Sequence, residues 1–133
     1  MIFGYIAHPD KIEKRISVTP EVVKRFHKEN IQVLINKDYG KNSNISDQNF
    51  VDAGAQVESV EKIYSCSDVV VQIYFEDLEA AKLLKKNCYL IVNHFNKNNK
   101  ELDSVLRSKN INVFSLDLLP RITRAQSMDI LSS

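Results

Sequence analysis

Short apolar runs alternate with amphipathic stretches along most of the chain. Five runs rich in branched apolar residues predict strands, at residues 2–7, 31–35, 68–74, 89–92 and 111–119. Between them, apolar residues recur at helical spacing and predict helices at residues 19–30, 47–54, 60–65, 76–86 and 100–109. Val69, Val70 and Val71 are consecutive, which is typical of a strand covered on both faces in a parallel sheet.

Capping residues mark several helix boundaries. Thr19 can cap the first helix, and Pro20 suits its first helical position. Ser46 or Asp47 can cap the second helix, and Gly54 is typical of a left-handed terminal residue that closes it.

This alternation predicts an α/β fold, a flavodoxin-like doubly wound sheet of about five mostly parallel strands with helices on both faces. A chain of 133 residues fits one domain. In such sheets, functional groups gather beyond the carboxyl ends of the strands near the topological switch point. That rule selects one neighbourhood, made of residues 8–15, 72–76, 93–95 and 120 onward.

Composition narrows the possible partners. Lys plus Arg number 18 and Asp plus Glu number 17, so no overall field favours nucleic acid or an anionic membrane. The first residues have no basic region and too few apolar residues for a signal peptide or a membrane span, which predicts a soluble, cytoplasmic chain without direct membrane insertion. Cys66 and Cys88 lack the spacing of metal ligands, and we expect both to be reduced packing residues.

Several enzyme motifs are absent from the sequence. A dinucleotide fold would place Gly-x-Gly-x-x-Gly directly after a strand, but none of the three glycines, Gly4, Gly40 and Gly54, has that context. The sequence has no Walker loop, no Gly-x-Ser-x-Gly elbow and no metal-ligand spacing. We therefore expect no bound metal, and no nucleotide bound to this chain alone.

Two segments carry a family resemblance. The segment from Leu119 to Ser133 concentrates Arg121, Gln126 and Asp129 where the last strand ends, and Arg15-Ile16-Ser17-Val18-Thr19-Pro20 opens the first helix. Both segments, together with Asp52-Ala53-Gly54-Ala55, resemble domain I of the proton-translocating NAD(P) transhydrogenases, within the alanine dehydrogenase/transhydrogenase N-terminal domain family. The resemblance spans the whole chain and is strongest at its two ends.

The resemblance implies roles for particular residues. Arg121, Gln126, Asp129 and Ser132 would line the place of a nicotinamide ring, and Gln126 would reach toward the ribose of NADP(H) on another domain. A carboxamide needs both an acceptor and donors, which Asp129, Arg121 and Ser132 could supply. Hydride transfer needs positioning groups rather than a protein acid or base. Arg15 would lie in the substrate pocket.

Simpler interpretations exist for the same residues. Without the resemblance, Arg121 and Asp129 could form a surface ion pair, and Asp129 and Ser132 could be solvated residues on one helical face. Arg15 could be an exposed residue before a helix cap. His94 could contact a ligand or be an ordinary hydrogen-bonded histidine.

The chain departs from the alanine dehydrogenases at two positions. That family has a lysine in the third strand and a histidine after the fourth, which hold the substrate acid. Gln72 and Asn93 stand at the corresponding positions here. A chain without these cations should bind a keto acid poorly, which favours a transhydrogenase over a fragment of an alanine dehydrogenase-like enzyme.

From the resemblance we expect residues 1–133 to be the N-terminal subdomain of transhydrogenase domain I, ending before the Rossmann NAD-binding subdomain. The expected partners are that Rossmann subdomain, an NADP(H)-binding domain and a membrane domain, with NAD(H) bound by the complete domain, which would be a homodimer peripheral to the inner membrane. Alone, the chain would be inactive. The alternative is a non-catalytic docking or assembly module, with the polar terminal loop as its contact surface.

Overall fold

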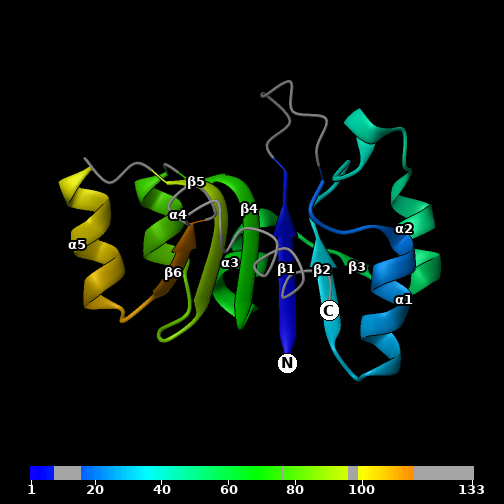
Figure 1. The fold of residues 1–133 in the computed structure, drawn as a ribbon, viewed down its shortest axis with the longest axis horizontal. Coiled ribbons are helices and arrows are strands. Elements are labelled where there is room, and N and C mark those ends of the chain that lie inside the picture. Colours follow the sequence, from blue (N-terminus) through cyan, green and yellow to red (C-terminus); the bar gives the residue numbers. More distant parts are fainter. Residues whose placement is uncertain (8–15, 76, 96–98, 116–133) are drawn as a thin grey trace, which may run out of the picture.

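Six parallel strands form one sheet in the computed structural model, which describes residues 1–7, 16–75, 77–95 and 99–115. Their order across the sheet is β3-β2-β1-β4-β5-β6, with β1 in the centre (Figure 1). The strands are β1 Ile2–Ile6, β2 Gln32–Ile35, β3 Gln56–Val57, β4 Val69–Phe75, β5 Tyr89–Phe95 and β6 Asn112–Ser115.

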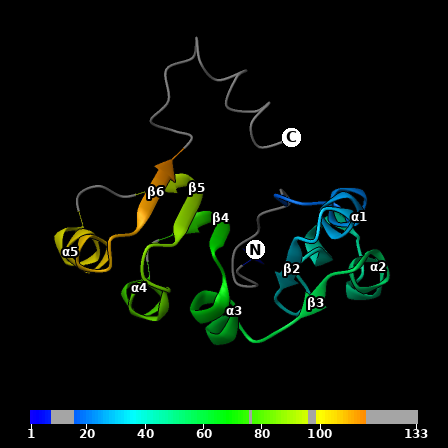
Figure 2. The same cartoon turned by 90° about the horizontal axis from the view of Figure 1, so that it is seen from below.

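Helices lie on both faces of this sheet. They are α1 Pro20–Lys28, α2 Asp47–Ala53, α3 Val60–Cys66, α4 Leu78–Leu83 and α5 Lys100–Ser108, with a short 3₁₀ helix, η1, at Lys41–Ser43. Figure 2 shows α1 and α2 beside β2 and β3 on one side, while α3, α4 and α5 line the other side. The predicted doubly wound α/β fold is confirmed.

Each side of the sheet has its own hydrophobic core. On the side of α3, α4 and α5, residues such as Ile63, Leu84 and Leu102 pack against Val70 and Leu90 of the strands. On the side of α1 and α2, a second cluster forms around buried residues that include Tyr5, Val23, Val33, Tyr39 and Phe50. Burial on both faces explains the uninterrupted apolar run of β4.

The structure adds one strand that was not predicted. β3 has only two residues, Gln56 and Val57, both exposed, which pair in parallel with Leu34 and Ile35 of β2. The five predicted strands alone follow the flavodoxin-like order, and β3 extends it to the order of a classical dinucleotide-binding sheet. A strand of two exposed residues has no apolar alternation by which the sequence could reveal it.

Helix boundaries follow the capping residues. The Thr19 and Ser46 side chains accept hydrogen bonds from the backbone of Val22 and Asn49, and Gly54 closes α2 at a φ of 119°. α4 is shorter than the predicted helix at 76–86 and ends at Leu83. The Lys109 ammonium donates to the Leu84 carbonyl at 2.8 Å, which satisfies a backbone acceptor at this end of the helix.

Asp68 joins three segments at the amino edge of the sheet. Its carboxylate accepts a hydrogen bond from the Ile2 backbone N–H at 2.8 Å and another from the Lys85 ammonium at 2.7 Å. These bonds hold the pKa of the Asp68 carboxyl below its ordinary value, the bond from Lys85 contributing most. The carboxylate therefore helps to place the start of β1 beside β4.

Replacing Asp68 with asparagine should lower the free energy of unfolding near neutral pH by no more than about 1 kcal/mol, because the pair is partly exposed. A carboxyl whose pKa is lowered by folding stabilises the protein above its unfolded pKa, and that contribution is lost as the pH falls through the lower folded pKa. The difference between wild type and Asp68→Asn in urea unfolding should shrink when the pH is lowered from 7 to 3. A difference that stays constant over this range would contradict the role of the carboxylate.

Both cysteines are free thiols, as predicted. Cys88 is buried, and this burial raises the pKa of its thiol, whereas Cys66 is half-buried. Within the described ranges, no helix has the length and apolar character that a membrane crossing needs.

Candidate functional site

The carboxyl ends of β1, β4 and β5 lie next to one another. Ile6 at the end of β1 pairs with Gln72 of β4, and Gln72 pairs in turn with Val92 of β5. From β1 the chain proceeds to β2 and β3 on one side, and it then continues on the other side with β4, β5 and β6. The boundary between β1 and β4 is thus the topological switch point, where open α/β sheets bind ligands.

Gln72 is held in place at this boundary by a tyrosine from α3. The side chain is only 2% exposed, and its Oε1 accepts a hydrogen bond from the Tyr64 hydroxyl at 2.9 Å. Burial raises the pKa of Tyr64 to about 12, so its hydroxyl remains a neutral donor at physiological pH. Gln72 therefore holds a fixed, uncharged amide against α3, on the face of the sheet opposite α1.

The connection between β1 and α1 is hydrogen-bonded near both of its ends to residues that lie just after β2. The Asn36 side chain forms two hydrogen bonds with the Ala7 backbone, and the Tyr39 hydroxyl accepts one from the Ser17 N–H. The sequence analysis singled out neither residue. An amide directly after a strand, at the edge where functional groups gather, was the one available signal.

The predicted site residues fall mostly outside the described part of the chain. The residues outside the described ranges are Arg15, Arg121, Gln126, Asp129 and Ser132. Asn93 is half-buried in β5, and the backbone of His94 pairs with Tyr74. The structure brings together the described parts of the predicted neighbourhood, Gln72–Phe75 and Asn93–Phe95, on adjacent strands.

An apolar hollow of about 560 Å³ lies on the α1 side of the sheet, beside Gln72 and Asn93. No charged side chain is among the described residues that line it. Its floor is the β4–β6 face, which we define by its outward apolar residues Val69, Val71, Tyr89, Ile91 and Phe114.

The outer part of the β4–β6 face is open to solvent. Tyr89 and Phe114 stack with ring centroids 6.1 Å apart and are 47% and 54% exposed. Val69 and Val71 of β4 belong to the buried cluster on the side of α1 and α2, whereas Tyr89 and Phe114 are exposed beyond it. The other three helices lie on the opposite face (Figure 2). A contiguous apolar patch of this kind usually marks a contact surface.

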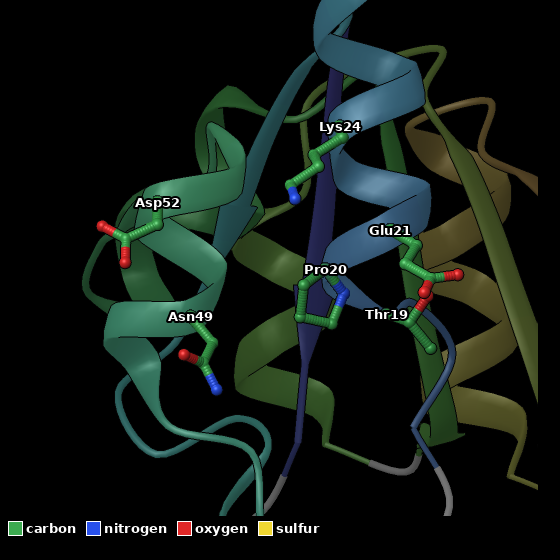
Figure 3. Close-up of a pocket in the computed structure, with 6 residues that line it drawn as sticks. All are labelled: Thr19, Pro20, Glu21, Lys24, Asn49 and Asp52. Carbon is green, nitrogen blue, oxygen red and sulfur yellow. The ribbon is translucent and has the colours of Figure 1, made fainter.

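A second hollow of about 660 Å³ separates α1 from α2 (Figure 3). Figure 3 shows Lys24 and Asn49 extending toward the space between the two helices, whereas the Asp52 carboxylate points away from α1. Neither Gln72 nor Asn93 lines this groove, and its charged residues Glu21, Lys24 and Asp52 include both signs. It offers no convergent set of groups for one ligand.

The chemistry of the described site is that of positioning. Of the described residues, no three His, Cys, Asp or Glu side chains gather to hold a metal ion. The half-buried Asn93 amide can donate and accept hydrogen bonds but cannot transfer protons at neutral pH. Such groups can orient a ligand for a reaction that requires no acid or base from the protein.

Comparisons with known proteins cover nearly the whole chain. Residues 8–133 match the family described as alanine dehydrogenase/PNT, N-terminal domain. The NAD(P) transhydrogenase subunit alpha of Haemophilus influenzae is 33% identical over 121 residues, which cover 91% of this chain and 23% of that protein. The chain thus spans about a quarter of the length of this relative.

Two solved structures resemble the fold. The crystal structure of transhydrogenase from Sinorhizobium meliloti matches with a TM-score of 0.79 and 28% identity, over 97% of this chain and 39% of that chain. An L-alanine dehydrogenase matches with a TM-score of 0.76 and 22% identity, over 87% of this chain and 32% of that chain. The second likeness concerns the fold alone.

Proposed function

The chain belongs to the alanine dehydrogenase/PNT N-terminal domain family, and on this basis we propose that it is part of a proton-translocating NAD(P) transhydrogenase. In that enzyme it would form the N-terminal subdomain, residues 1–133, of the domain that binds NAD(H). The reaction is hydride transfer between NAD(H) and NADP(H), with NADP(H) held by a partner domain. Because hydride transfer would need the rest of the enzyme, the isolated chain should be inactive.

One observation carries the proposal. The segments that contain Arg15 and Arg121 directly follow β1 and β6, and parallel strands send both segments out from the same edge of the sheet. The carboxyl ends of β4 and β5 lie between β1 and β6 in the order of the sheet. A ligand at the switch point would thus meet groups from both ends of the chain.

The proposed roles follow the chemistry of the nicotinamide carboxamide. Arg121 and Ser132 would donate to its oxygen, Asp129 would accept from its amide nitrogen, and Gln126 would reach the ribose of NADP(H). Oriented groups of this kind accelerate hydride transfer by holding the two nicotinamide rings in a reactive geometry. The cofactor supplies the hydride, and the protein supplies the orientation.

An alanine dehydrogenase-like activity is less well supported. A keto acid carries a carboxylate that needs cationic partners at the strand ends. Gln72 is neutral, is buried and accepts a hydrogen bond from the Tyr64 hydroxyl, while Asn93 is a neutral amide. Neither amide supplies the cationic partner that a carboxylate needs.

A chimera tests the proposed roles. In it, residues 1–133 replace the matched segment of the Haemophilus influenzae subunit alpha, produced with the rest of that transhydrogenase. Replacing Arg121 or Gln126 with alanine should slow hydride transfer at least about 100-fold, as loss of an oriented charge-stabilising donor does in other enzymes. The measurement is steady-state reduction of an NADP⁺ analogue by NADH.

Arg107→Ala is the matched control for this experiment. Arg107 lies on α5, is 81% exposed and pairs along its own helix with Asp103 at 2.8 Å, so its loss should leave turnover unchanged. Equal turnover in the Arg121→Ala and Arg107→Ala chimeras would contradict the assignment of Arg121.

A docking or assembly module is the second candidate, and the exposed β4–β6 face favours it. The relatives are three to four times longer than this chain, so the occupant we propose is an apolar surface from the remaining part of the domain. The polar terminal loop, the other predicted contact surface, lies outside the described residues.

Calorimetry separates the two candidates. The isolated chain is titrated with NADH, with and without a second polypeptide that corresponds to the rest of the relative's NAD(H)-binding domain. The second polypeptide alone is the control. If the mixture binds more NADH than this control and the isolated chain binds none, a divided nucleotide site is supported. Association of the polypeptides without such a gain, abolished by Phe114→Ser, would support docking alone, and NADH binding by the isolated chain would contradict both.

A further inference from the structure

The two faces of β5 and β6 are covered unequally. On one face, Leu90 of β5 packs in one cluster with Leu84 and Leu102 and is fully buried. On the other face, Tyr89 and Phe114 are 47% and 54% exposed. Sheets in which all strands are parallel are almost always covered on both faces. Among the described residues, Tyr89 and Phe114 thus lack the covering layer that Leu90 has.

The outward side chains of the β4–β6 face form two apolar rows. Val71 of β4 pairs with Ile91 of β5, and Ile91 pairs with Phe114 of β6. Val69 and Tyr89 form a second row, two residues nearer the amino edge. Neighbouring strands lie about 4.8 Å apart, so the face is roughly 10 Å wide. An α-helix with its side chains is also about 10 Å across, so the face has the width of one helix.

α1 supplies a wall beside this face. Phe26 of α1 packs on Phe3 of β1 with ring centroids 5.3 Å apart, and both rings line the apolar hollow of about 560 Å³. The stacked rings of Tyr89 and Phe114 line the same hollow from β5 and β6. Helices that pack side by side have axes about 8–10 Å apart, or two strand spacings. A helix next to α1 would therefore lie over β4 and β5, between the two pairs of rings.

The lack of charge in the hollow restricts what can fill it. No charged side chain is among its described lining residues, and Asn93 brings an amide to it near the carboxyl end of β5. A charge buried here would lose water without gaining an ion partner, which is costly. The occupant must therefore present an apolar surface. On a helix, such a surface needs apolar residues at positions i, i+3, i+4 and i+7.

The size of the face indicates where the occupant comes from. The face extends roughly 13 Å along β4 from Val69 to Ile73, which gives a footprint of roughly 130 Å². A stable interface between separate proteins buries about 800 Å² on each partner, so the face is too small for a second copy of the chain. A tethered segment of the same polypeptide needs far less area, because its effective concentration is on the order of 1 mM. The Haemophilus relative has polypeptide for such a segment, since this chain covers only 23% of it.

We propose that the β4–β6 face is the docking site of one amphipathic α-helix, supplied by the part of the longer relatives that this chain does not match. The helix lies beside α1 over β4 and β5. Its apolar stripe packs on Val71 and Ile91, and its sides contact Phe26 and the Tyr89–Phe114 stack. This inference deepens the docking candidate and rests on one part of the proposed function, that residues 1–133 are a piece of a longer domain.

Thiol accessibility tests the docking. Phe114→Cys is placed in the isolated chain and in the Haemophilus chimera, and its reaction with a maleimide is followed by mass spectrometry of the peptide that contains position 114. The reaction should be at least about tenfold slower in the chimera, because modification requires the helix to open away from the face. Tyr89→Cys, on the neighbouring strand, should give the same result.

Leu83→Cys is the matched control for these reporters. Leu83 is 40% exposed at the end of α4, which lies on the opposite side of the sheet (Figure 2). Its substitution should react at the same rate in both proteins. Slowing at all three positions would show general shielding by the larger protein and would overturn the docking of a helix on this face.

Photocrosslinking identifies the occupant. A benzophenone maleimide attached to Phe114→Cys in the chimera is irradiated, and the crosslinked peptide is sequenced by mass spectrometry. We expect a peptide from outside the segment that residues 1–133 replace, with apolar residues at i, i+3, i+4 and i+7. A crosslink to residues 1–133, to a second subunit alpha or to a segment without this spacing would overturn the proposal.

The remaining outcomes separate this inference from the proposed function. Equal maleimide rates at position 114 in the two proteins would overturn the helix. So would slow reaction in the isolated chain, whether from its own residues or, where the rate depends on concentration, from a second copy. Hydride transfer by the wild-type chimera is measured in parallel. Protection without hydride transfer would support the helix and overturn the transhydrogenase role, whereas hydride transfer without protection would overturn the helix alone.

Discussion

Replacing Phe50 with alanine should lower the free energy of unfolding by about 4 kcal/mol, the typical cost of removing a buried aromatic ring. Phe50 is fully buried in α2 and packs against Tyr39, whose ring in turn lies 6.3 Å from that of Tyr5 in β1. The ring thus connects a helix to the central strand through one other aromatic side chain. Its removal would leave a cavity that these rigid neighbours cannot fill.

Val51→Ala is the control for the Phe50 prediction. Val51 is the next residue of the same helix but is 42% exposed, so its truncation should cost less than about 1 kcal/mol. Urea unfolding followed by circular dichroism measures both variants. A similar loss for the two would contradict the burial and packing of Phe50.

Replacing Gly4 with alanine should lower the free energy of unfolding by about 3 kcal/mol through overpacking. Gly4 lies in the middle of β1 and faces α3. An added Cβ would lie 2.2 Å from the Ser67 Oγ and 2.5 Å from the Ile63 Cγ2, far inside van der Waals contact. Ile63 is fully buried and its branched side chain has little rotamer freedom, so the helix or the strand would have to shift.

Ser67 provides an internal check on that explanation. Its hydroxyl is buried without a hydrogen-bond partner among the described residues, so Ser67→Ala alone should be neutral or slightly stabilising. Combined with Gly4→Ala, it should recover about 1 kcal/mol, because the shorter of the two clashes is removed. Strictly additive effects in a thermal or urea melt would show that Gly4 matters for a reason other than its contact with α3.

Tyr39 makes two separable contacts, one through its ring and one through its hydroxyl. The ring of Tyr39 belongs to the core on the α1 side, while its hydroxyl holds Ser17. Phe50→Ala removes the ring contact and leaves the hydroxyl, whereas Tyr39→Phe does the reverse. A comparison of these variants therefore separates core packing from the position of the β1–α1 connection.

Local patterns were sufficient for most of the secondary structure. The run Val69–Val71 predicted a strand covered on both faces, and Thr19, Ser46 and Gly54 predicted helix ends that the structure confirms. These signals lie in neighbouring residues, since side-chain periodicity and caps act within one or two turns. β5 extends three residues beyond the predicted strand because its pairing with β4 continues to Phe95.

The candidate site was predictable only in part. The structure places the predicted segments 72–75 and 93–95 on adjacent strands, which strand order suffices to predict, while their part in a site stays a prediction. Arg121, Gln126, Asp129, Ser132 and Arg15 rest on the family resemblance and remain predictions. No property of the isolated residues distinguishes such groups from ordinary polar surface.

The sequence by itself determined the alternation of strands and helices, the parallel sheet and the absence of a glycine-rich pyrophosphate loop. Only the tertiary structure decided that Asn36 binds Ala7, 29 positions away, that Tyr39 binds Ser17, and that the outer β4–β6 face is open among the described residues. The physical reason is range. Propensity, periodicity and capping are properties of adjacent residues, whereas these contacts exist only after the sheet has brought distant segments together.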